Sequence, residues 1–539
     1  MKGFRKIQAF FRHRETVLVL LIGLLFFALG AAVIVQSGGY HLTAEELKKD
    51  FTPSAEHTDK DPEASAEESS FNYENPTIVP GNILDRNGTV LCDLSHFDAE
   101  TNWGNYIDAE IYSPLIGWMH ASEAGSSGLM NQYYRVLRDS SGDNFHGKDV
   151  YLTLDHTLQK RVYDIYCQYV AKDEESRQKI GSALVMDVSS GEMLACVAFP
   201  TYDITKWREG DINTMNQIPV THADAMLPGS TFKLLTSVLW LEDTHQDESG
   251  SEVGNDAVTF PMETFEIAGK PITNWNGFPA WIESLDYVGA IEWSSNVFFA
   301  QVMLNVKDSV PKLREICQRI HIGEDWALDF GTNVSRWLLA GDTFNALPLE
   351  EQKYMIANTG YGQEGVLLSS VSDAMIGAAM CNGGEVPVPH MIHSVVNSGG
   401  FNEDLDRLGV SGLSSHYENL RLTTAETADK IYQAMQKAAL NPAVIGFEEH
   451  ENIAAKTGTA EVDVMMADGT FQRKDHTWMV ACKEIDGRQY VVVVNQALTD
   501  LAYSRDLIEP VRDIFAAVEE YSRSAHTAEN PQASAGAVS

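Results

Sequence analysis

The chain has 539 residues, 44% of them hydrophobic, which is enough apolar material to fill a large core and to build more than one domain. Lys and Arg number 39 against 76 Asp and Glu, so the formal net charge is −37. A protein that binds nucleic acid needs a basic surface, so this charge excludes nucleic acid as an expected partner. The six cysteines form no CxxC pair and no spaced Cys/His cluster, so we expect neither a disulfide framework nor a metal site.

An apolar segment near the N-terminus predicts a membrane anchor. Residues 16–36 carry no charge, and about 20 such residues are needed to cross a bilayer as a helix. Basic residues lie within residues 1–15 and acidic residues follow the segment. We therefore expect a single-pass protein with a cytoplasmic N-terminus and the rest of the chain outside. The alternative is a cleaved signal peptide, whose apolar core is usually only about 7–15 residues long.

The remainder of the chain divides by composition. Residues 37–72 are polar and acidic, which is typical of a flexible stalk. Residues 73–175 are predicted to form a small N-terminal domain, with a hairpin turn at the Asn-Gly pair of residues 87–88. Residues 176–522 form the main domain, and the small polar residues of 523–539 predict a disordered tail.

Strand patterns lie at both ends of the main domain. Residues 181–199 are two apolar runs joined by a turn, which predicts a hairpin. Residues 451–462, 476–484 and 489–496 are strand candidates joined by short links, and short links make neighbouring strands antiparallel. Residues 506–523 have apolar residues at helical spacing. We therefore predict an α/β (α+β) domain with a mainly antiparallel sheet flanked by helices and a mainly helical region inserted between the two ends.

A serine and a lysine stand at the start of an apolar helical run, "PGSTFKLLTSVLWLE", in which Ser230 and Lys233 are three residues apart. Residues at this spacing share a helix face, so the two side chains can touch. A serine nucleophile needs a nearby base, and burial favours the neutral amine of lysine, which can accept a proton. The alternative is a helix-capping serine beside a lysine that extends to solvent.

The same Ser-x-x-Lys spacing occurs twice more, at residues 176–179 and 309–312. The first occurrence lies in a charged stretch, and the second resembles the cap of an amphipathic helix. Neither opens a buried helix, so the spacing alone does not indicate catalysis.

Two further motifs contain polar residues between apolar runs. Ser294-Ser295-Asn296 separates two helical patterns, and a turn at this point would aim Ser294 and Asn296 at one site, although a simple helix cap is the alternative. Lys456-Thr457-Gly458 lies in a strand candidate. It is either an edge strand protected by its lysine or the wall of a cleft, where Gly458 allows a substrate backbone to approach.

Ser-x-x-Lys, Ser-x-Asn and Lys-Thr-Gly, in this order, resemble the motifs of the penicillin-recognising serine enzymes. The contexts "PGSTFK", "KTGTAE", "GNILDRNG", "LTLDHTLQ" and "VMDVSSGEMLACVAFPTYD" are similar to those of class B penicillin-binding proteins, the monofunctional peptidoglycan transpeptidases. The resemblance covers about residues 76–520. Pro80 and Met130 depart from the usual pattern, both in the first domain.

The resemblance implies a penicillin-binding/β-lactamase-like transpeptidase domain on a small N-terminal pedestal domain with one transmembrane helix. In that family pattern Ser230 attacks the D-Ala-D-Ala end of a stem peptide, Lys233 takes its proton, and Ser294 relays a proton to the leaving amine. Lys456 tunes Ser294, and Asn296 bonds the substrate amide. The identity of the base is disputed among relatives, so Lys233 in that role is a hypothesis.

The third motif is implied to bind substrate. Thr457 and Thr459 would hold the terminal carboxylate beside Gly458, and the backbone N–H groups of Ser230 and Thr459 would form the oxyanion hole. No metal or organic cofactor is implied.

The implied partners are peptidoglycan stem peptides, β-lactam antibiotics that acylate Ser230, the bacterial cell membrane and a membrane glycosyltransferase. A D,D-carboxypeptidase or β-lactamase, which passes the acyl group to water, remains an alternative. So does a penicillin-binding sensor or scaffold without catalysis.

Overall fold

The computed structural model describes residues 78–97, 104–120, 123, 126–140, 145–206, 225–246, 249–465, 470–499 and 504–529. The predicted cytoplasmic tail, the anchor at 16–36 and the stalk therefore lie outside the described residues. Among the helices that are described, none combines the length and the apolar character needed to cross a membrane. Of the described residues, those within 78–460 and 475–529 form one compact unit, and 461–465 and 470–474 belong to a second unit.

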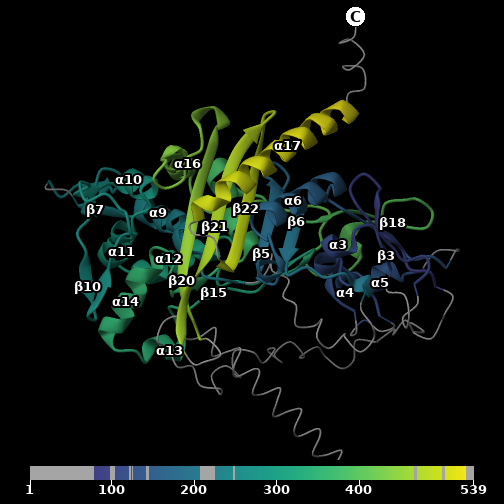
Figure 1. Ribbon diagram of the computed structural model, residues 1–539, viewed down its shortest axis with the longest axis horizontal. Helices are drawn as coiled ribbons and strands as arrows, with labels where there is room; N and C mark the ends of the chain where they lie inside the picture. The colour runs from purple at the N-terminus through teal and green to yellow at the C-terminus, as the bar shows by residue number, and fades with distance from the viewer. Residues whose placement is uncertain are drawn as a thin grey trace, which may run out of the picture. The chain divides into compact units, whose positions relative to one another are not determined.

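The central sheet has five strands in the order β20-β21-β22-β5-β6 (Figure 1). Its strands are β5 (Gly181–Asp187), β6 (Met193–Phe199), β20 (Ile453–Met465), β21 (Phe471–Ile485) and β22 (Arg488–Thr499). The pairs β21–β22, β22–β5 and β5–β6 are antiparallel. Asp486 and Gly487 have φ angles of 51° and 78°, the left-handed values that a two-residue hairpin turn requires. This confirms the prediction of an antiparallel sheet with strands from both ends of the domain.

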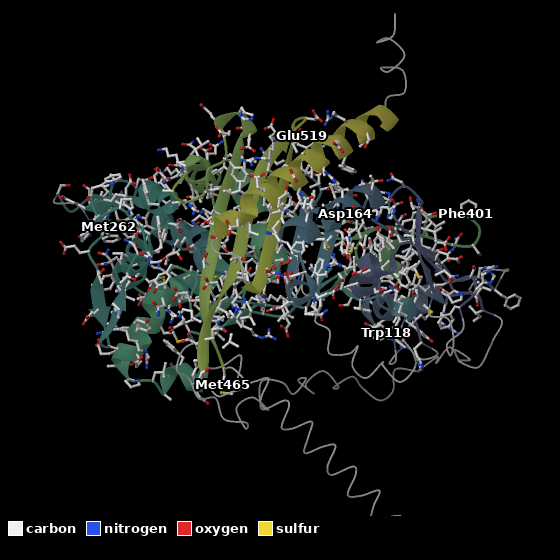
Figure 2. All side chains as sticks on the ribbon, viewed as in Figure 1. Trp118, Asp164, Met262, Phe401, Met465 and Glu519 are labelled. Atoms are coloured by element: carbon white, nitrogen blue, oxygen red, sulfur yellow. The ribbon has the colours of Figure 1, made fainter. Side chains whose placement is uncertain are left out.

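Helices cover both faces of this sheet. Neighbouring residues of a strand point to opposite faces, and on β21 the Cys482 Sγ lies 3.4 Å from the Gly377 carbonyl oxygen of α15 (Ser370–Cys381). The adjacent Lys483 forms an ion pair of 2.7 Å with Glu519 of α17 (Ile508–Glu529). Figure 1 shows α17 crossing the sheet, and Figure 2 labels Glu519. The central sheet therefore lies between α15 and α17.

Helix α17 differs from its prediction at both ends. It begins at Ile508, so Pro510 falls in its first turn, where a missing N–H costs nothing. It continues to Glu529, so residues 523–529 are helical and not part of the predicted tail. Its contacts with β22 and α6 (His156–Tyr169) explain why its first part is amphipathic.

The inserted region is helical only in part. Its helices are α9 (Lys233–Glu242), α10 (Tyr287–Glu292), α11 (Asn296–Asn305), α12 (Ser309–Gln318), α13 (Gly341–Asn345), α14 (Leu349–Thr359), α15 and α16 (Ala425–Leu440). Between them lie two-stranded sheets formed by β7 (Thr244–Gln246) with β8 (Glu252–Gly254), β9 (Phe260–Pro261) with β12 (Ser284–Leu285), β10 (Phe265–Ile267) with β11 (Lys270–Ile272), β13 (Trp326–Leu328) with β14 (Gly331–Asn333), β15 (Arg336–Trp337) with β16 (Val366–Leu367), and β17 (Glu385–Val386) with β19 (Leu420–Arg421). Strands of two or three residues are too short to show an alternating pattern in the sequence.

A second five-stranded sheet has the order β18-β4-β1-β2-β3. It contains β1 (Ile83–Leu84), β2 (Val90–Asp93), β3 (Asn105–Tyr106), β4 (Asp149–Leu152) and β18 (Ile392–Val396), and the short helices α3 (Ala109–Ile116), α4 (Gly128–Gln132) and α5 (Tyr134–Leu137) lie in the same part of the chain. The β1–β2 pair is the hairpin predicted at residues 87–88. β18 pairs antiparallel with β4, although the two strands are more than 200 residues apart in sequence. The domain boundary at residue 175 stays a prediction, and this sheet contains strands from both sides of it.

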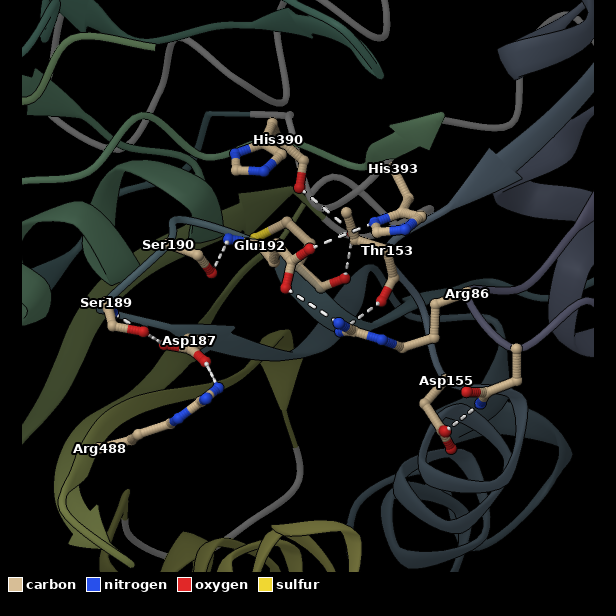
Figure 3. A network of polar contacts seen from close by, with 12 residues as sticks. Arg86, Thr153, Asp155, Asp187, Ser189, Ser190, Glu192, His390, His393 and Arg488 are labelled. Carbon is tan, nitrogen blue, oxygen red and sulfur yellow. Dashed lines mark hydrogen bonds and ion pairs between the residues drawn. The ribbon is translucent and has the colours of Figure 1, made fainter. Parts of the chain in front are cut away.

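A polar network joins the two sheets (Figure 3). Arg86, in the β1–β2 turn, bonds Glu192 at 3.2 Å beside the β5–β6 turn, and His393 of β18 lies 3.6 Å from the same carboxylate. Burial opposes the ionisation of Glu192, but the hydrogen bond from His393 and the charge of Arg86 outweigh it and lower the pKa to about 2. The charged carboxylate thus ties the first sheet to the second.

Candidate active site

Ser230 lies in a short 3₁₀ turn that runs directly into a buried helix. The turn is η5 (Gly229–Phe232) and the helix is α9. Three residues per turn place positions i and i+3 in line, so Ser230 and Lys233 project to the same side. Gly229 has φ 56°, and a Cβ at this position would lie 2.4 Å from the Thr459 carbonyl oxygen. The turn therefore needs glycine both for its backbone angle and for its contact with strand β20.

The Lys233 amine is fully buried and lies at the centre of the site. Its Nζ is 2.7 Å from Ser230 Oγ, 2.7 Å from the Ser294 carbonyl oxygen and 2.9 Å from Asn296 Oδ1. Burial, and then the nearby Lys456, hold the pKa of Lys233 well below its ordinary value. A neutral amine donates its two hydrogens to the carbonyl and the amide oxygen, and its lone pair is left for the Ser230 hydroxyl. This arrangement suits a general base.

The second motif forms a turn between two helices. Helix α10 ends at Glu292 and α11 begins at Asn296, while Ser294 has a left-handed φ of 49°, a strained value for a residue with a side chain. The helix cap is Ser295, whose Oγ accepts the Phe298 N–H at 3.1 Å. The Ser294 hydroxyl is therefore not used as a cap and lies 3.2 Å from Lys233 Nζ.

Lys456 on β20 is also fully buried, so it does not protect an edge strand by projecting into solvent. Its Nζ donates to Ser294 Oγ at 2.8 Å and to the Thr457 carbonyl oxygen at 3.0 Å. Burial lowers the pKa of Lys456 to about 7. Burial thus favours the neutral amine of Lys456, which lies next to the Ser294 hydroxyl that joins it to Lys233.

The rest of the third motif touches the Ser230 turn through the backbone. A Cβ on Gly458 would lie 2.4 Å from the Pro228 carbonyl oxygen, so this position also needs glycine. Thr459 is exposed and its backbone adjoins Gly229, whereas Thr457 is buried. The structure thus brings Ser230, Lys233, Ser294, Asn296 and Lys456 into one hydrogen-bonded cluster, with residues 457–459 beside the turn that carries Ser230.

Several supporting residues were missed by the sequence reasoning. The Thr273 carbonyl oxygen accepts Asn296 Nδ2 at 3.1 Å, and Asn274 Oδ1 accepts the Val297 N–H at 3.1 Å. Trp478 on β21 donates Nε1–H to the Leu227 carbonyl oxygen at 3.0 Å, just before the Ser230 turn. None of these belongs to a spaced motif, because each acts across 20 or more residues of sequence.

Within the described ranges, no group of three His, Cys, Asp or Glu side chains is placed to hold a metal ion. The cluster consists of hydroxyl, amine and amide groups, which is the chemistry of a serine nucleophile with a lysine base.

The family described as penicillin binding protein transpeptidase domain matches residues 181–516, more than half of the chain. This chain belongs to that family. Penicillin-binding protein 3 of Bacillus subtilis (strain 168) is 21% identical over 432 residues, which are 73% of this chain and 57% of that protein. The peptidoglycan D,D-transpeptidase PbpA of Mycobacterium tuberculosis (strain H37Rv) is 23% identical over 423 residues, 72% of this chain and 78% of that protein.

Solved structures show the same fold. The D,D-transpeptidase domain of a peptidoglycan glycosyltransferase from Eggerthella lenta superimposes with a TM-score of 0.65 at 21% identity, covering 83% of this chain and 99% of that one. The penicillin G acyl-enzyme of penicillin-binding protein A from M. tuberculosis gives a TM-score of 0.62 at 19% identity, covering 82% and 99%. These matches confirm the resemblance to class B penicillin-binding proteins.

Proposed function

We propose that this penicillin-binding protein is a membrane-anchored peptidoglycan D,D-transpeptidase that cross-links stem peptides through an acyl-enzyme on Ser230. The observation that carries the proposal is the position of Lys233 Nζ, within 3 Å of Ser230 Oγ and of two oxygens that only accept hydrogen bonds. The names of the relatives from B. subtilis and M. tuberculosis support the same activity.

The first half-reaction forms the acyl-enzyme. Ser230 Oγ bonds to the carbonyl carbon of the penultimate D-Ala while its proton passes to Lys233. The peptide C–N bond then breaks, and the proton reaches the leaving D-Ala amine through Ser294, which lies between the two lysines. Backbone N–H groups of Ser230 and Thr459 stabilise the oxyanion, an effect worth about 3 kcal/mol per donor.

The second half-reaction transfers the acyl group. The amine of a neighbouring stem peptide bonds to the acyl carbon, the ester bond to Ser230 breaks, and the amine's proton returns to Ser230 Oγ through Lys233. Asn296 positions the substrate amide, and Thr457, Gly458 and Thr459 line the place of the substrate carboxylate. β-Lactams enter the first half-reaction and remain bound as esters of Ser230.

The setting of this chemistry is part of the proposal. Residues 16–36 anchor the chain in a bacterial cell membrane, residues 73–175 form a pedestal domain, and the catalytic domain faces outward. A membrane glycosyltransferase supplies the glycan strands. The length and charge of the N-terminal segment support this arrangement.

The proposal is tested by labelling with a fluorescent penicillin. The wild type and the control Ser309→Ala are expected to be labelled, and Ser230→Ala is not. Labelling of Ser230→Ala would contradict the nucleophile. Mass spectrometry of products made from a donor peptide and an amine acceptor then identifies the reaction. A cross-linked product supports transpeptidation, and free D-Ala without it indicates a hydrolase.

A further inference from the structure

The loop between β11 and β12, residues 273–283, is fixed directly to the turn that carries Ser294. We call it the aromatic loop. Three consecutive residues of the loop make the contacts: the Thr273 carbonyl oxygen and Asn274 Oδ1 accept hydrogen bonds from Asn296 and Val297, and Trp275 Nε1 donates to the Trp293 carbonyl oxygen at 2.9 Å. The loop is therefore held in place beside the catalytic cluster.

This loop carries a cluster of aromatic rings that surrounds Trp293, the residue before Ser294. The ring centroids of Phe278 and Trp281 lie 6.4 and 5.8 Å from that of Trp293, both edge to face, and Trp275 packs on Phe278 at 6.2 Å. Trp281 is nevertheless 73% exposed. Single exposed apolar side chains are common on protein surfaces. A large aromatic ring that a fixed loop holds in solvent is less common, and it leaves an aromatic surface free to contact a ligand.

Acidic residues flank the stretch of backbone that carries Trp281. Glu283 is exposed two residues further along, and its carbonyl oxygen accepts the Met262 N–H at 2.9 Å, which places Glu263 next to it. Neither Glu263 nor Glu283 has an ion-pair partner within the part of the chain that the structure describes. An indole face beside free carboxylates attracts an ammonium group through cation–π and charge interactions.

We propose that the aromatic loop first docks the acceptor stem peptide through its protonated side-chain amine, with Trp281 as its principal contact, and that this amine leaves the contact and gives one proton to solvent before it attacks the acyl group on Ser230. This inference rests on the proposed transpeptidation, because that reaction requires an amine to approach the acyl group on Ser230. The aromatic loop adjoins the Ser294–Asn296 turn, and so it is placed where such a side chain can bind next to the acyl-enzyme. A contact with a sugar ring or with a neutral apolar group is the competing outcome.

The test uses a thioester donor without a free amine, so that acylation and transfer are measured separately. For Trp281→Ala, the KM for an amine acceptor is expected to rise about 2- to 30-fold, while donor acylation and transfer to methanol, a neutral acceptor, keep their rates. Trp281→Phe is expected to lie between the wild type and Trp281→Ala. The matched control is Phe401→Ala, because Phe401 is 71% exposed and lies far from Met262 in Figure 2.

Calorimetry gives a second measurement that does not depend on turnover. The penicilloyl enzyme is titrated with the acceptor peptide and with its N-acetylated, neutral form. The proposal is supported if Trp281→Ala binds the charged peptide more weakly than the wild type does and binds the neutral peptide equally well. It is overturned if Trp281→Ala binds the charged peptide as well as the wild type does, or loses both forms equally. A wild type that binds the charged peptide but forms no cross-link would contradict the proposed function and not the docking site.

Discussion

Two serine–lysine pairs with identical spacing occupy very different surroundings in this protein. Ser230 and Lys233 are joined at 2.7 Å, and the lysine is fully buried among oxygen acceptors. Ser309 instead donates its hydroxyl to the Met303 carbonyl oxygen at 2.6 Å, and Lys312 forms an ion pair of 2.7 Å with Asp243 while 44% of its side chain is exposed. Spacing brings serine and lysine to one helix face in both places, but only Lys233 is buried beside a second lysine, and both of these surroundings lower its pKa.

The largest expected difference between the two pairs is in acylation rate. Lys233→Met is expected to slow acylation by a β-lactam by about 1,000-fold or more, because the serine loses its base. Lys312→Met should leave the rate within about twofold, since the residue lies outside the cluster. Time courses of fluorescent penicillin labelling measure both. If both variants lost acylation rate equally, burial would not be what distinguishes Lys233 from Lys312.

The adjacent residues Ser294 and Ser295 are expected to differ in their effect on acylation rate. Ser294→Ala should lower the acylation rate about 100-fold, because it removes the hydroxyl between Lys233 and Lys456. Ser295→Ala removes only the helix cap and is expected to cost about 1 kcal/mol of unfolding free energy with a much smaller effect on rate. Denaturant unfolding and labelling kinetics, measured on the same samples, distinguish the roles. A large loss of rate in Ser295→Ala and none in Ser294→Ala would show that Ser295, and not Ser294, takes part in acylation.

The buried lysines also predict a dependence of stability on pH. The pKa of Lys456 is about 7 when folded and about 10.4 when unfolded, so between pH 7 and 10 the unfolded chain binds one more proton than the folded one. The free energy of unfolding contributed by this group therefore rises with pH in that window, by roughly 1.4 kcal/mol per pH unit. Lys456→Met removes this contribution. An unchanged slope in denaturant titrations from pH 7 to 10 would refute the assignment.

The exposed pair gives the smallest effect. Lys312→Met breaks the ion pair with Asp243 and is expected to lower the free energy of unfolding by less than about 1 kcal/mol. Added salt should shrink the difference, because salt screens the attraction between exposed charges. A larger loss would contradict the assignment of Lys312 to an exposed ion pair.

The sequence predicted the site better than it predicted the support around it. The three motifs are local, and each brings its own turn or strand, so Ser230, Lys233, Ser294 and Lys456 could be named from spacing and apolar context. The contacts of Thr273, Asn274 and Trp478 join segments distant in sequence and leave no local pattern. Asp373 on α15 was missed although its sequence neighbours are mostly apolar: it is buried, and burial raises its pKa to about 7 against the opposing effect of Thr231.

The absence of a local signal for distant contacts also explains where the predicted fold was wrong. The long strands of the central sheet have apolar cores that are visible in the sequence, whereas the two- and three-residue strands of the inserted region are fixed only by the tertiary contacts around them. The pairing of β18 with β4 joins residues that no local signal connects. Helix α17 exceeds its predicted end because residues such as Ser524 tolerate helix when the preceding turns are already packed on β22.

The position of β18 has a consequence for how the protein is made. A ribosome synthesises the strands of the N-terminal sheet through Leu152 early, but the edge of β4 has no partner until Val396 has left the exit tunnel. The central sheet is completed even later, because β5 pairs with β22, which ends at Thr499. Both sheets are therefore completed late in translation, and their unpaired strand edges are exposed to non-native pairing until β18 and β22 have been made.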